Sequence, residues 1–177
     1  MGLFAIVLIF LSAKKFEPST EIPFAKDINF ATLDDGLTQP LYSSITKSGD
    51  EVQIAADQII STDQKDTALI KSANLKIFSD DGHSIFLSSD TAILNKKKKN
   101  LIFKKNVTLT KDKKIKITAP EISTALDKTL IQADGPVRGL FVDGNIKAGQ
   151  LNIFRENISG KLVITFTKGV KMIYTGY

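Results

Sequence analysis

The feature that most constrains the fold is a two-strand unit that recurs with a period of about 30 residues. One copy is Leu101 to Thr124 (LIFKKNVTLTKDKKIKITAPEIST), in which apolar and polar residues alternate on both sides of a charged turn, Lys111 to Lys114. Such alternation is typical of half-buried β-strands, because successive side chains point to opposite faces of a sheet. A single hairpin cannot bury an apolar face by itself. The unit therefore needs neighbouring copies of itself to pack against.

Two series of positions give the spacing of the copies. Residues that lead a strand are spaced by 32, 30 and 33 positions: Leu75, Val107, Val137 and Val170. Small residues that close the following strand are spaced by 33, 30 and 29 positions: Ala56, Ser89, Ala119 and Ala148. A fixed period in a chain without helix-period segments predicts an all-β array, in which each unit buries its apolar face against the next.

The alternation also predicts which side chains point into the array. The inward set is Val52, Ile54, Leu75, Ile77, Ile85, Leu87, Leu101, Phe103, Val107, Leu109, Ile115, Ile117, Ile146, Ala148, Leu162, Ile164 and Phe166. Lys105 falls on the inward parity between Phe103 and Val107, which is unfavourable for a charge. Two explanations stay open: a β-bulge beside Asn106, or a lysine whose charged end reaches solvent at a rim.

The amino end carries the only continuous apolar run, Gly2 to Ala13, followed by Lys14 and Lys15. Twelve helical residues reach about 18 Å, which is short of the roughly 30 Å hydrocarbon core of a bilayer. The run is the end of a transmembrane anchor, a weak signal peptide, or a short membrane-associated helix or core strand. We expect a short hydrophobic helix and membrane anchor at 1–15 and an extended linker at 16–28.

Composition and motifs argue against an enzyme. The 177 residues are 42% hydrophobic and 24% charged, a globular profile, and contain no cysteine, which excludes disulfides and a thiol nucleophile. His83, the only histidine, lies in the turn Asp80 to His83, where we expect an exposed residue. No phosphate-binding loop, dinucleotide fingerprint or nucleophile elbow occurs. We therefore expect no catalytic residue, no metal site and no cofactor.

The net charge of +5 comes mainly from lysine, with one run at Lys96 to Lys99. Two interpretations stay open: a solvated surface that protects strand edges from aggregation, or attraction to an anionic partner such as a membrane surface or a phosphorylated lipid. The basic residues are not interleaved with aromatic residues that could stack on bases, so we expect no nucleic-acid partner.

Several stretches resemble a known family. They are SGDEVQIAAD, SANLKIFSDDGHSIFLSSD, LIFKKNVTLTKDKKIKITAPEI, LIQADGPVRGLFVDGNIKAG and LVITFTKGVKMIY. In them N-V or G-V leads a strand, and x-I-x-A closes the next. Together with the single hydrophobic segment and linker, they resemble the LptC family of the lipopolysaccharide export system, within the OstA-like jellyroll superfamily. The resemblance covers about Phe30 to Tyr174 and implies a twisted, open β-jellyroll at 29–177.

The resemblance implies two kinds of binding site. The inward set, apart from Leu101 and Leu162, is expected to line a groove for lipopolysaccharide, in which acyl chains gain about 0.8 kcal/mol for each buried CH₂ group. The open ends of the sheet expose strand edges, to which another chain can add a strand. The edge expected to bind a partner comprises Leu162, Ile164, Gly169, Val170 and Met172. An N-terminal edge is expected around Asn29 to Ile45.

In the family, such a protein is a non-enzymatic, single-pass inner-membrane protein with most of its chain in the periplasm. The resemblance implies that it receives lipopolysaccharide from an inner-membrane ABC transporter and passes it to a soluble periplasmic bridge protein of the same fold. One alternative is the soluble bridge itself, with Gly2 to Ala13 removed as a signal. Another is a β-solenoid enzyme acting on polysaccharide, for which recurring acids occur at Asp57, Asp90 and Glu121.

Overall fold

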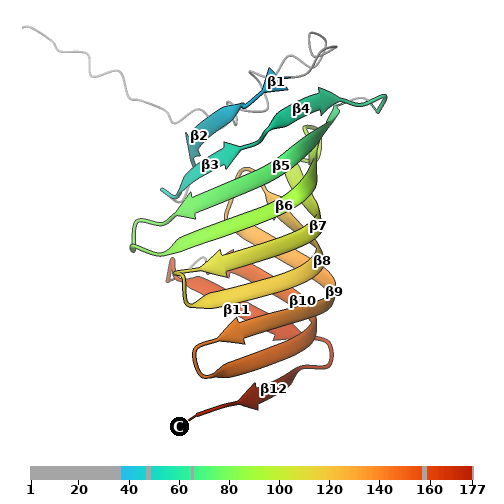
Figure 1. Ribbon diagram of the computed structural model, residues 1–177. Helices are drawn as coiled ribbons and strands as arrows, with labels where there is room; N and C mark the ends of the chain where they lie inside the picture. Colours follow the sequence, from blue (N-terminus) through green and yellow to red (C-terminus); the bar gives the residue numbers. More distant parts are fainter. Residues whose placement is uncertain (1–36, 47–48, 65, 157–158, 177) are drawn as a thin grey trace, which may run out of the picture.

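The structure, a computed structural model, describes residues 37–46, 49–64, 66–156 and 159–176. The secondary-structure elements in this part of the chain are all β-strands, and the twelve strands form one antiparallel sheet (Figure 1). The strands are β1 (Leu37–Thr38), β2 (Leu41–Ile45), β3 (Glu51–Ala55), β4 (Gln58–Ser61), β5 (Thr67–Phe78), β6 (Ser84–Asn95), β7 (Asn100–Lys111), β8 (Ile115–Ala125), β9 (Leu130–Phe141), β10 (Gly144–Arg155), β11 (Leu162–Thr167) and β12 (Lys171–Tyr174). The prediction of an all-β open sheet is confirmed.

The expected anchor at 1–15 and linker at 16–28 lie outside the described residues, as does the start of the expected domain at 29. Within the described ranges, no helix is long and apolar enough to cross a membrane.

The twelve strand segments form nine long strands. β3 and β4 both pair with β5, one on each half of it, so together they act as a single interrupted strand. In the same way β1 and β2 pair with β4 and β3, and β11 and β12 both pair with β10. The sheet therefore continues at both ends as broken strands, while β5 to β10 between them are unbroken runs of eleven or twelve residues.

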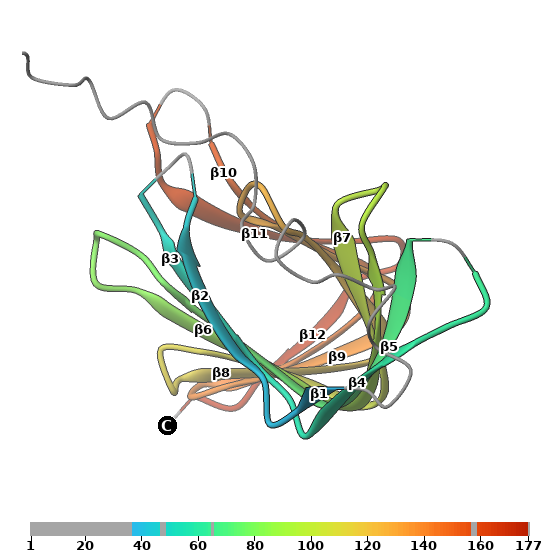
Figure 2. The ribbon, with the colours of Figure 1, turned by 90° about the horizontal axis from the view of Figure 1, so that it is seen from above.

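Each long strand bends near its middle. The register shifts between neighbouring strands at this level, for example between Ser88 and Thr91 and between Lys104 and Val107. β-Bulges of this kind increase local twist and turn a strand. As a result, the sheet curls around its own interior, and β2 and β3 come round toward the far ends of β10 and β11 (Figure 2). This is the open jellyroll that the sequence predicts.

The bend decides between the two explanations for Lys105. Lys105 and Asn106 both have positive φ, 62° and 54°, and they form the irregularity in the pairing of β7 with β8. Both side chains are exposed, while Phe103 and Val107 on either side are buried. The bulge lets the chain resume its inward parity, so the bulge explanation is confirmed, and an inward lysine whose charged end reaches solvent at a rim is not needed.

The same bends correct one detail of the sequence analysis. The small residues and acids near Ala56, Ser89, Ala119 and Ala148 were expected to close strands. Instead, three of these four positions lie inside β6, β8 and β10, where the strand turns, and only Ala56 lies in a gap, between β3 and β4. The segments that were expected to be separate strands on either side of these three positions are therefore the two halves of one long strand.

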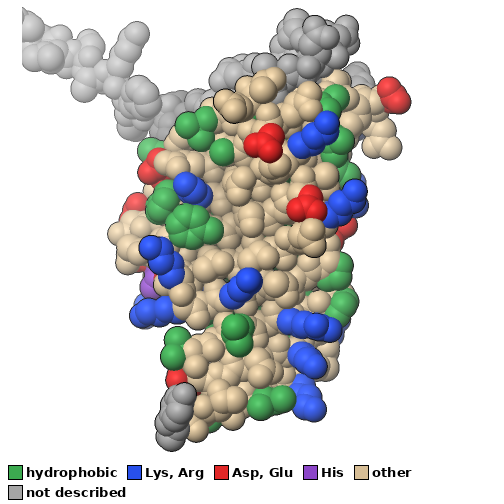
Figure 3. All heavy atoms as spheres, in the orientation of Figure 1, with side chains coloured by type: hydrophobic (Ala, Val, Ile, Leu, Met, Phe, Trp, Pro, Cys, Tyr) green, Lys and Arg blue, Asp and Glu red, His purple; other side chains and the backbone are tan. Residues whose placement is uncertain are grey.

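The core fills the interior of the curled sheet. It comprises the inward side chains of both strand halves, and the largest fully buried ones are Phe103, Ile59, Ile70, Leu75, Ile85, Leu87, Leu94, Leu101, Leu109, Ile117, Ile122 and Ile131. The outer face differs: Figure 3 shows basic and acidic side chains spread over it among polar ones. One apolar face and one solvated face are the usual arrangement for an antiparallel sheet.

Candidate functional site

The predicted lipid-binding groove lies inside the curled sheet. Of its fifteen residues, twelve are buried, and the other three, Ile115, Ile164 and Phe166, are half-buried and pack against the core. The structure thus brings together the residues that the alternation placed on one face. Their contact with a lipid stays a prediction.

The interior is closed by its own side chains. Phe103, Leu109 and Ile117 are 0% exposed, so solvent does not reach the middle of the interior. Protein interiors of this kind are close-packed, with few voids larger than a water molecule. An acyl chain can therefore occupy this space only if the two halves of the sheet move apart or if it displaces side chains at an end.

Two of the half-buried members, Ile164 and Phe166, mark the carboxyl-terminal end of the interior. Ile164 and Phe166 lie on β11, and the ring of Phe166 packs edge-to-face on Phe141 with centroids 6.2 Å apart. All residues of β11 from Leu162 to Phe166 are half-buried. Here apolar side chains are both part of the core and within reach of the surface.

A charged cluster that the sequence analysis missed joins the two ends of the curl. Asp50, after the β2–β3 turn, is 0% exposed and forms an ion pair with Arg155 at the end of β10. Arg155 Nε donates a hydrogen bond to Asp50 Oδ2 over 3.0 Å, and Nη2 donates to Asp50 Oδ1. Thr129 Oγ1 donates to Asp50 Oδ2 over 2.5 Å. We call Asp50, Thr129 and Arg155 the clasp.

The clasp gathers four turns around one guanidinium group. Arg155 Nη1 donates to the carbonyl oxygen of Gly160 in the β10–β11 turn and lies 3.8 Å from Asp81 Oδ2 in the β5–β6 turn. Asp50 comes from the β2–β3 turn, and Thr129 from the β8–β9 turn. Asp50 and Arg155 are 105 residues apart in sequence, so this contact joins the early strands of the sheet to its late ones.

Asp50 and Arg155, the two ionisable residues of the clasp, are both charged at neutral pH. Burial by itself raises the pKa of Asp50. The hydrogen bonds from Arg155 and Thr129 and the positive charge of Arg155 together lower this pKa by more than burial raises it, so the pKa of Asp50 lies below its ordinary value. The hydrogen bond to Asp50 in turn raises the pKa of Arg155. The pair is thus ionised, and bidentate hydrogen bonding of an arginine to a carboxylate gives it a defined geometry.

One signal for this pair was available in the sequence. The chain has only two arginines, Arg138 and Arg155, among its 24 basic residues. Arginine presents a planar fork that suits buried ion pairs better than lysine does. An arginine at the end of a strand, in a chain that otherwise uses lysine, is therefore a candidate for a buried partner.

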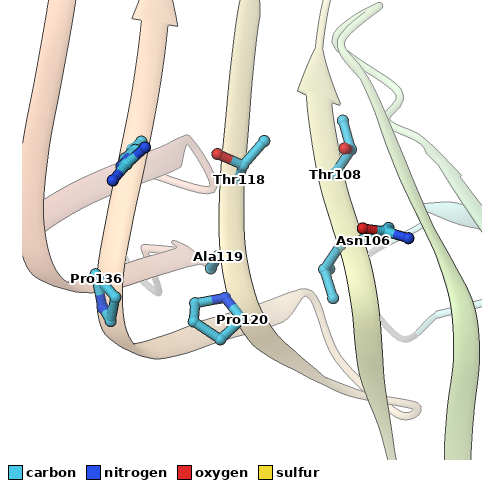
Figure 4. A pocket seen from close by; sticks show the side chains of 8 residues that line it. Asn106, Thr108, Thr118, Ala119, Pro120 and Pro136 are labelled. Carbon is cyan, nitrogen blue, oxygen red and sulfur yellow. The ribbon is translucent and has the colours of Figure 1, made fainter.

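A depression of about 470 Å³ lies on the outer side of the bends. Figure 4 shows its lining side chains on three neighbouring strands, with Asn106 and Thr108 on β7, Thr118 and Pro120 on β8, and Pro136 on β9. These side chains point away from the buried interior, and most are exposed. Their hydroxyl and amide groups can hydrogen-bond a solute.

His83 and the recurring acids occupy ordinary surface positions. The His83 side chain is 47% exposed, as expected, and its Nδ1 lies 2.9 Å from Asp112 Oδ2. Asp90 accepts a hydrogen bond from Asn106 over 2.7 Å, and Glu121 pairs with Lys104 over 3.1 Å. In the part of the chain that the structure describes, no group of three or more histidines, aspartates and glutamates comes together to hold a metal ion.

The two ends of the sheet carry exposed apolar side chains. At the first end, Leu41 and Ile45 of β2 are 76% and 75% exposed. At the other end, the exposed side chains on or beside the last strand are Val170, Met172, Ile173 and Tyr174, with Leu140 and Val142 nearby on the β9–β10 hairpin. Of the predicted partner edge, Leu162 and Ile164 lie on β11, Met172 lies on β12, and Gly169 and Val170 lie between these strands. The structure therefore places this set at a true edge of the sheet.

Fold and site together define an open β-jellyroll with an apolar interior and a strand edge at each end. The chain belongs to the family described as lipopolysaccharide-assembly, LptC-related, whose sequence profile matches residues 37–153. The match runs from β1 into β10, and it confirms the resemblance that the repeat indicated. Members of this family are non-enzymatic components of lipopolysaccharide transport. No curated protein matches the chain.

Proposed function

We propose that this protein binds the acyl chains of lipopolysaccharide in the interior of its jellyroll and passes the lipid onward to the outer membrane. The observation that carries the proposal is the continuous apolar interior, lined by alternate residues of every long strand. Acyl chains need only apolar surface, because burying each CH₂ group gains about 0.8 kcal/mol without any catalytic group.

The partners follow from the two edges. We propose that the lipid arrives from an inner-membrane ABC transporter at the β1–β2 end and leaves to a soluble bridge protein of the same fold at the β11–β12 end. Exposed apolar residues on both edges support this arrangement, because an edge strand offers unpaired backbone groups to a further strand. A partner of the same fold would continue both the sheet and its apolar interior.

The location follows from the same proposal. We propose a single membrane anchor within residues 1–15, with the jellyroll in the periplasm. The alternative is that the chain is the soluble bridge, with its amino end removed as a signal. Mass spectrometry of the native amino terminus separates the two, since an anchor is retained and a signal peptide is cleaved.

Photo-crosslinking tests the lipid site. A photoreactive phenylalanine derivative replaces Phe103, which is fully buried, or Phe166, which is half-buried at the end of the interior. Phe86 is the matched control, because it packs on Phe78 with ring centroids 6.0 Å apart and faces away from the interior. The aromatic ring is kept at all three positions, which limits the disturbance to the fold.

The proposal predicts lipopolysaccharide adducts in cells at the two inward positions and none at the outward one. An adduct at Phe86 that is as strong as those inside would show surface association instead of a conduit. Absence of adducts at both inward positions, in a protein with a normal circular dichroism spectrum, would contradict the proposed lipid site.

A further inference from the structure

The long strands end in two rows of turns that face each other. The first turn row contains the β2–β3, β5–β6, β7–β8 and β9–β10 turns, and the second turn row contains the β4–β5, β6–β7, β8–β9 and β10–β11 turns. On one side of the jellyroll, the bends connect the two rows, and the backbone of each long strand is continuous there. On the other side the rows approach each other, as Figure 2 shows for β2 and β3 against β10 and β11.

The clasp lies on the side of the jellyroll where the two turn rows approach each other, and it connects them. Asp50 and Asp81 belong to the first turn row, and Thr129 and Arg155 belong to the second. The two halves of the sheet can separate here by breaking side-chain contacts, whereas parting them at the bends would require breaking the strands themselves. The side of the jellyroll that the clasp crosses is therefore the one that can open.

The chemistry of the clasp suits contacts that open and close. A buried ion pair gains little net stability, because desolvation of the charges offsets much of their attraction. When the rows part, Asp50 and Arg155 both return to water and regain their hydration. An apolar contact of the same size would have no such compensation. The closed state is thus specific in geometry, while the open state is not prohibitively unfavourable.

The rows also differ in charge near the clasp. The turns of the first row that act on Arg155 contribute Asp50, Asp80 and Asp81, whereas the β7–β8 turn of the same row carries Lys111, Lys113 and Lys114. Beside Thr129 in the second turn row, a depression of about 360 Å³ is lined by Lys97, Lys98, Lys99 and Lys128, with one acid, Asp127. Arginine and lysine both bind phosphate groups, and arginine does so through two parallel hydrogen bonds. A phosphorylated headgroup at the opening between the two turn rows (the mouth) can therefore replace Asp50 as the partner of Arg155.

We propose that the clasp is a lateral gate to the interior: it opens to let acyl chains pass between the turn rows while the phosphorylated headgroup stays outside, against the second turn row. The inference rests on the proposed lipid-binding function. A lateral path fits an amphiphile, because its charged end never has to cross the apolar interior, which would be unfavourable for an unpaired charge.

A covalent lock across the gate tests the proposal. Asp81 and Gly160 both approach the same nitrogen of Arg155, and Ser159 is the exposed neighbour of Gly160. The chain contains no cysteine, so the variant carrying Asp81→Cys and Ser159→Cys has a unique pair of thiols. A flexible bismaleimide links them across the mouth, and mass spectrometry verifies the link. The same variant treated with a monofunctional maleimide is the reference.

The readout is the association rate with fluorescently labelled lipopolysaccharide, followed by polarisation. We expect the locked protein to associate about tenfold or more slowly than the reference, because binding that requires a conformational change is blocked with it. Equal rates in the two samples would overturn the gate and leave lipid binding intact, with entry from an end of the jellyroll. No binding by the wild-type protein would overturn the proposed function itself, and the gate with it.

A second variant acts in the opposite direction. Asp50→Asn combined with Arg155→Gln removes both charges of the clasp and leaves no unpaired buried ion. We expect association about three- to tenfold faster than in the wild type, because the open state becomes more populated. The matched control, Lys104→Gln with Glu121→Gln, removes an ion pair between two neighbouring strands whose side chains are 43% and 47% exposed. Equal acceleration by both double variants would refute a specific role for the clasp.

Discussion

Replacement of Ile117 by alanine tests whether the interior is a packed core or an open groove. Ile117 is 0% exposed and lies in the middle of the first half of β8. The substitution removes three carbon groups, which at about 0.8 kcal/mol each amounts to about 2.4 kcal/mol of lost burial. A cavity left in a core that cannot collapse adds to this loss, so we expect the free energy of unfolding to fall by about 3–4 kcal/mol.

Ile115→Ala is the matched control, since the same side chain lies two residues away on the same face of β8. Ile115 is only half-buried, so about half the burial is lost and little cavity forms. We expect a decrease of about 1–2 kcal/mol. Urea unfolding followed by far-UV circular dichroism measures both values, and an unchanged dependence on urea concentration shows that the unfolded states are comparable.

The comparison has a clear refuting outcome. In an open groove, the side chain of Ile117 would already contact water, and its truncation would leave no cavity. A loss below about 1 kcal/mol for Ile117→Ala, or a loss no larger than that of Ile115→Ala, would show that the interior is open in the resting protein. The gate would then have no closed state to hold.

Two further predictions concern the clasp and the last edge. The pKa of Asp50 is lowered, so its ion pair stabilises the fold at pH values above the ordinary pKa of 3.8, and that stabilisation is lost as the pH falls through the lower pKa of the folded state. Acid-unfolding curves should therefore differ between the wild type and Asp50→Asn. The control Asp134→Asn, at a side chain that is 72% exposed, should leave the acid-unfolding curve of the wild type unchanged. Gly144→Val should detach β12 and weaken binding of a partner at this edge, because a Cβ at Gly144 would lie 2.3 Å from the carbonyl oxygen of Ile173. Faster hydrogen exchange in β12, with protection retained in β8, is the expected result, and unchanged exchange in β12 would contradict it.

Local pattern was sufficient for the parts of the fold that depend on neighbours along a strand. Alternation placed Leu75, Leu109 and Ile117 on one face, and all three are buried together. It also singled out Lys105 as a charge on the inward parity, for which a β-bulge was one of two explanations, and the β-bulge lies there. Both results follow from the two-residue period of a strand, which is visible in a few consecutive residues.

The two halves of most strands were not recognised as one continuous strand, because the bends interrupt that period. In β8 the buried positions move from Ile117 to Ile122, an odd step that reverses the parity. From sequence alone, such a reversal is indistinguishable from the end of one strand and the start of another. Burial of Ile122 and Ile131 opposite the first halves depends on how far each bend turns the sheet, and no short window of sequence contains that information.

The clasp was missed for a different reason, although the rarity of arginine in this chain offered one weak signal. Asp50 follows Gly49 in a segment with the composition of a polar turn, where an acid is expected to be exposed. Its burial results from the approach of Arg155, 105 residues away, after the sheet has curled. Contacts made by closure of a curved sheet are set by the accumulated twist of many strands, so the residues involved carry only weak local signals.

The packed interior, closed by the ion pair of Asp50 and Arg155, lowers the affinity with which the protein can hold a lipid. If the interior carries acyl chains as we propose, each incoming CH₂ group gains burial only by displacing side chains that already fill the interior, such as Phe103 and Leu109. The net affinity is then smaller than the roughly 0.8 kcal/mol per CH₂ that a preformed empty cavity would give. A conduit must release what it binds, and a deep permanent cavity would hold a multi-chain lipid too tightly to pass it on. A core that reseals behind the departing lipid, with Asp50 and Arg155 paired again, stabilises the lipid-free state and so reduces the free-energy cost of release.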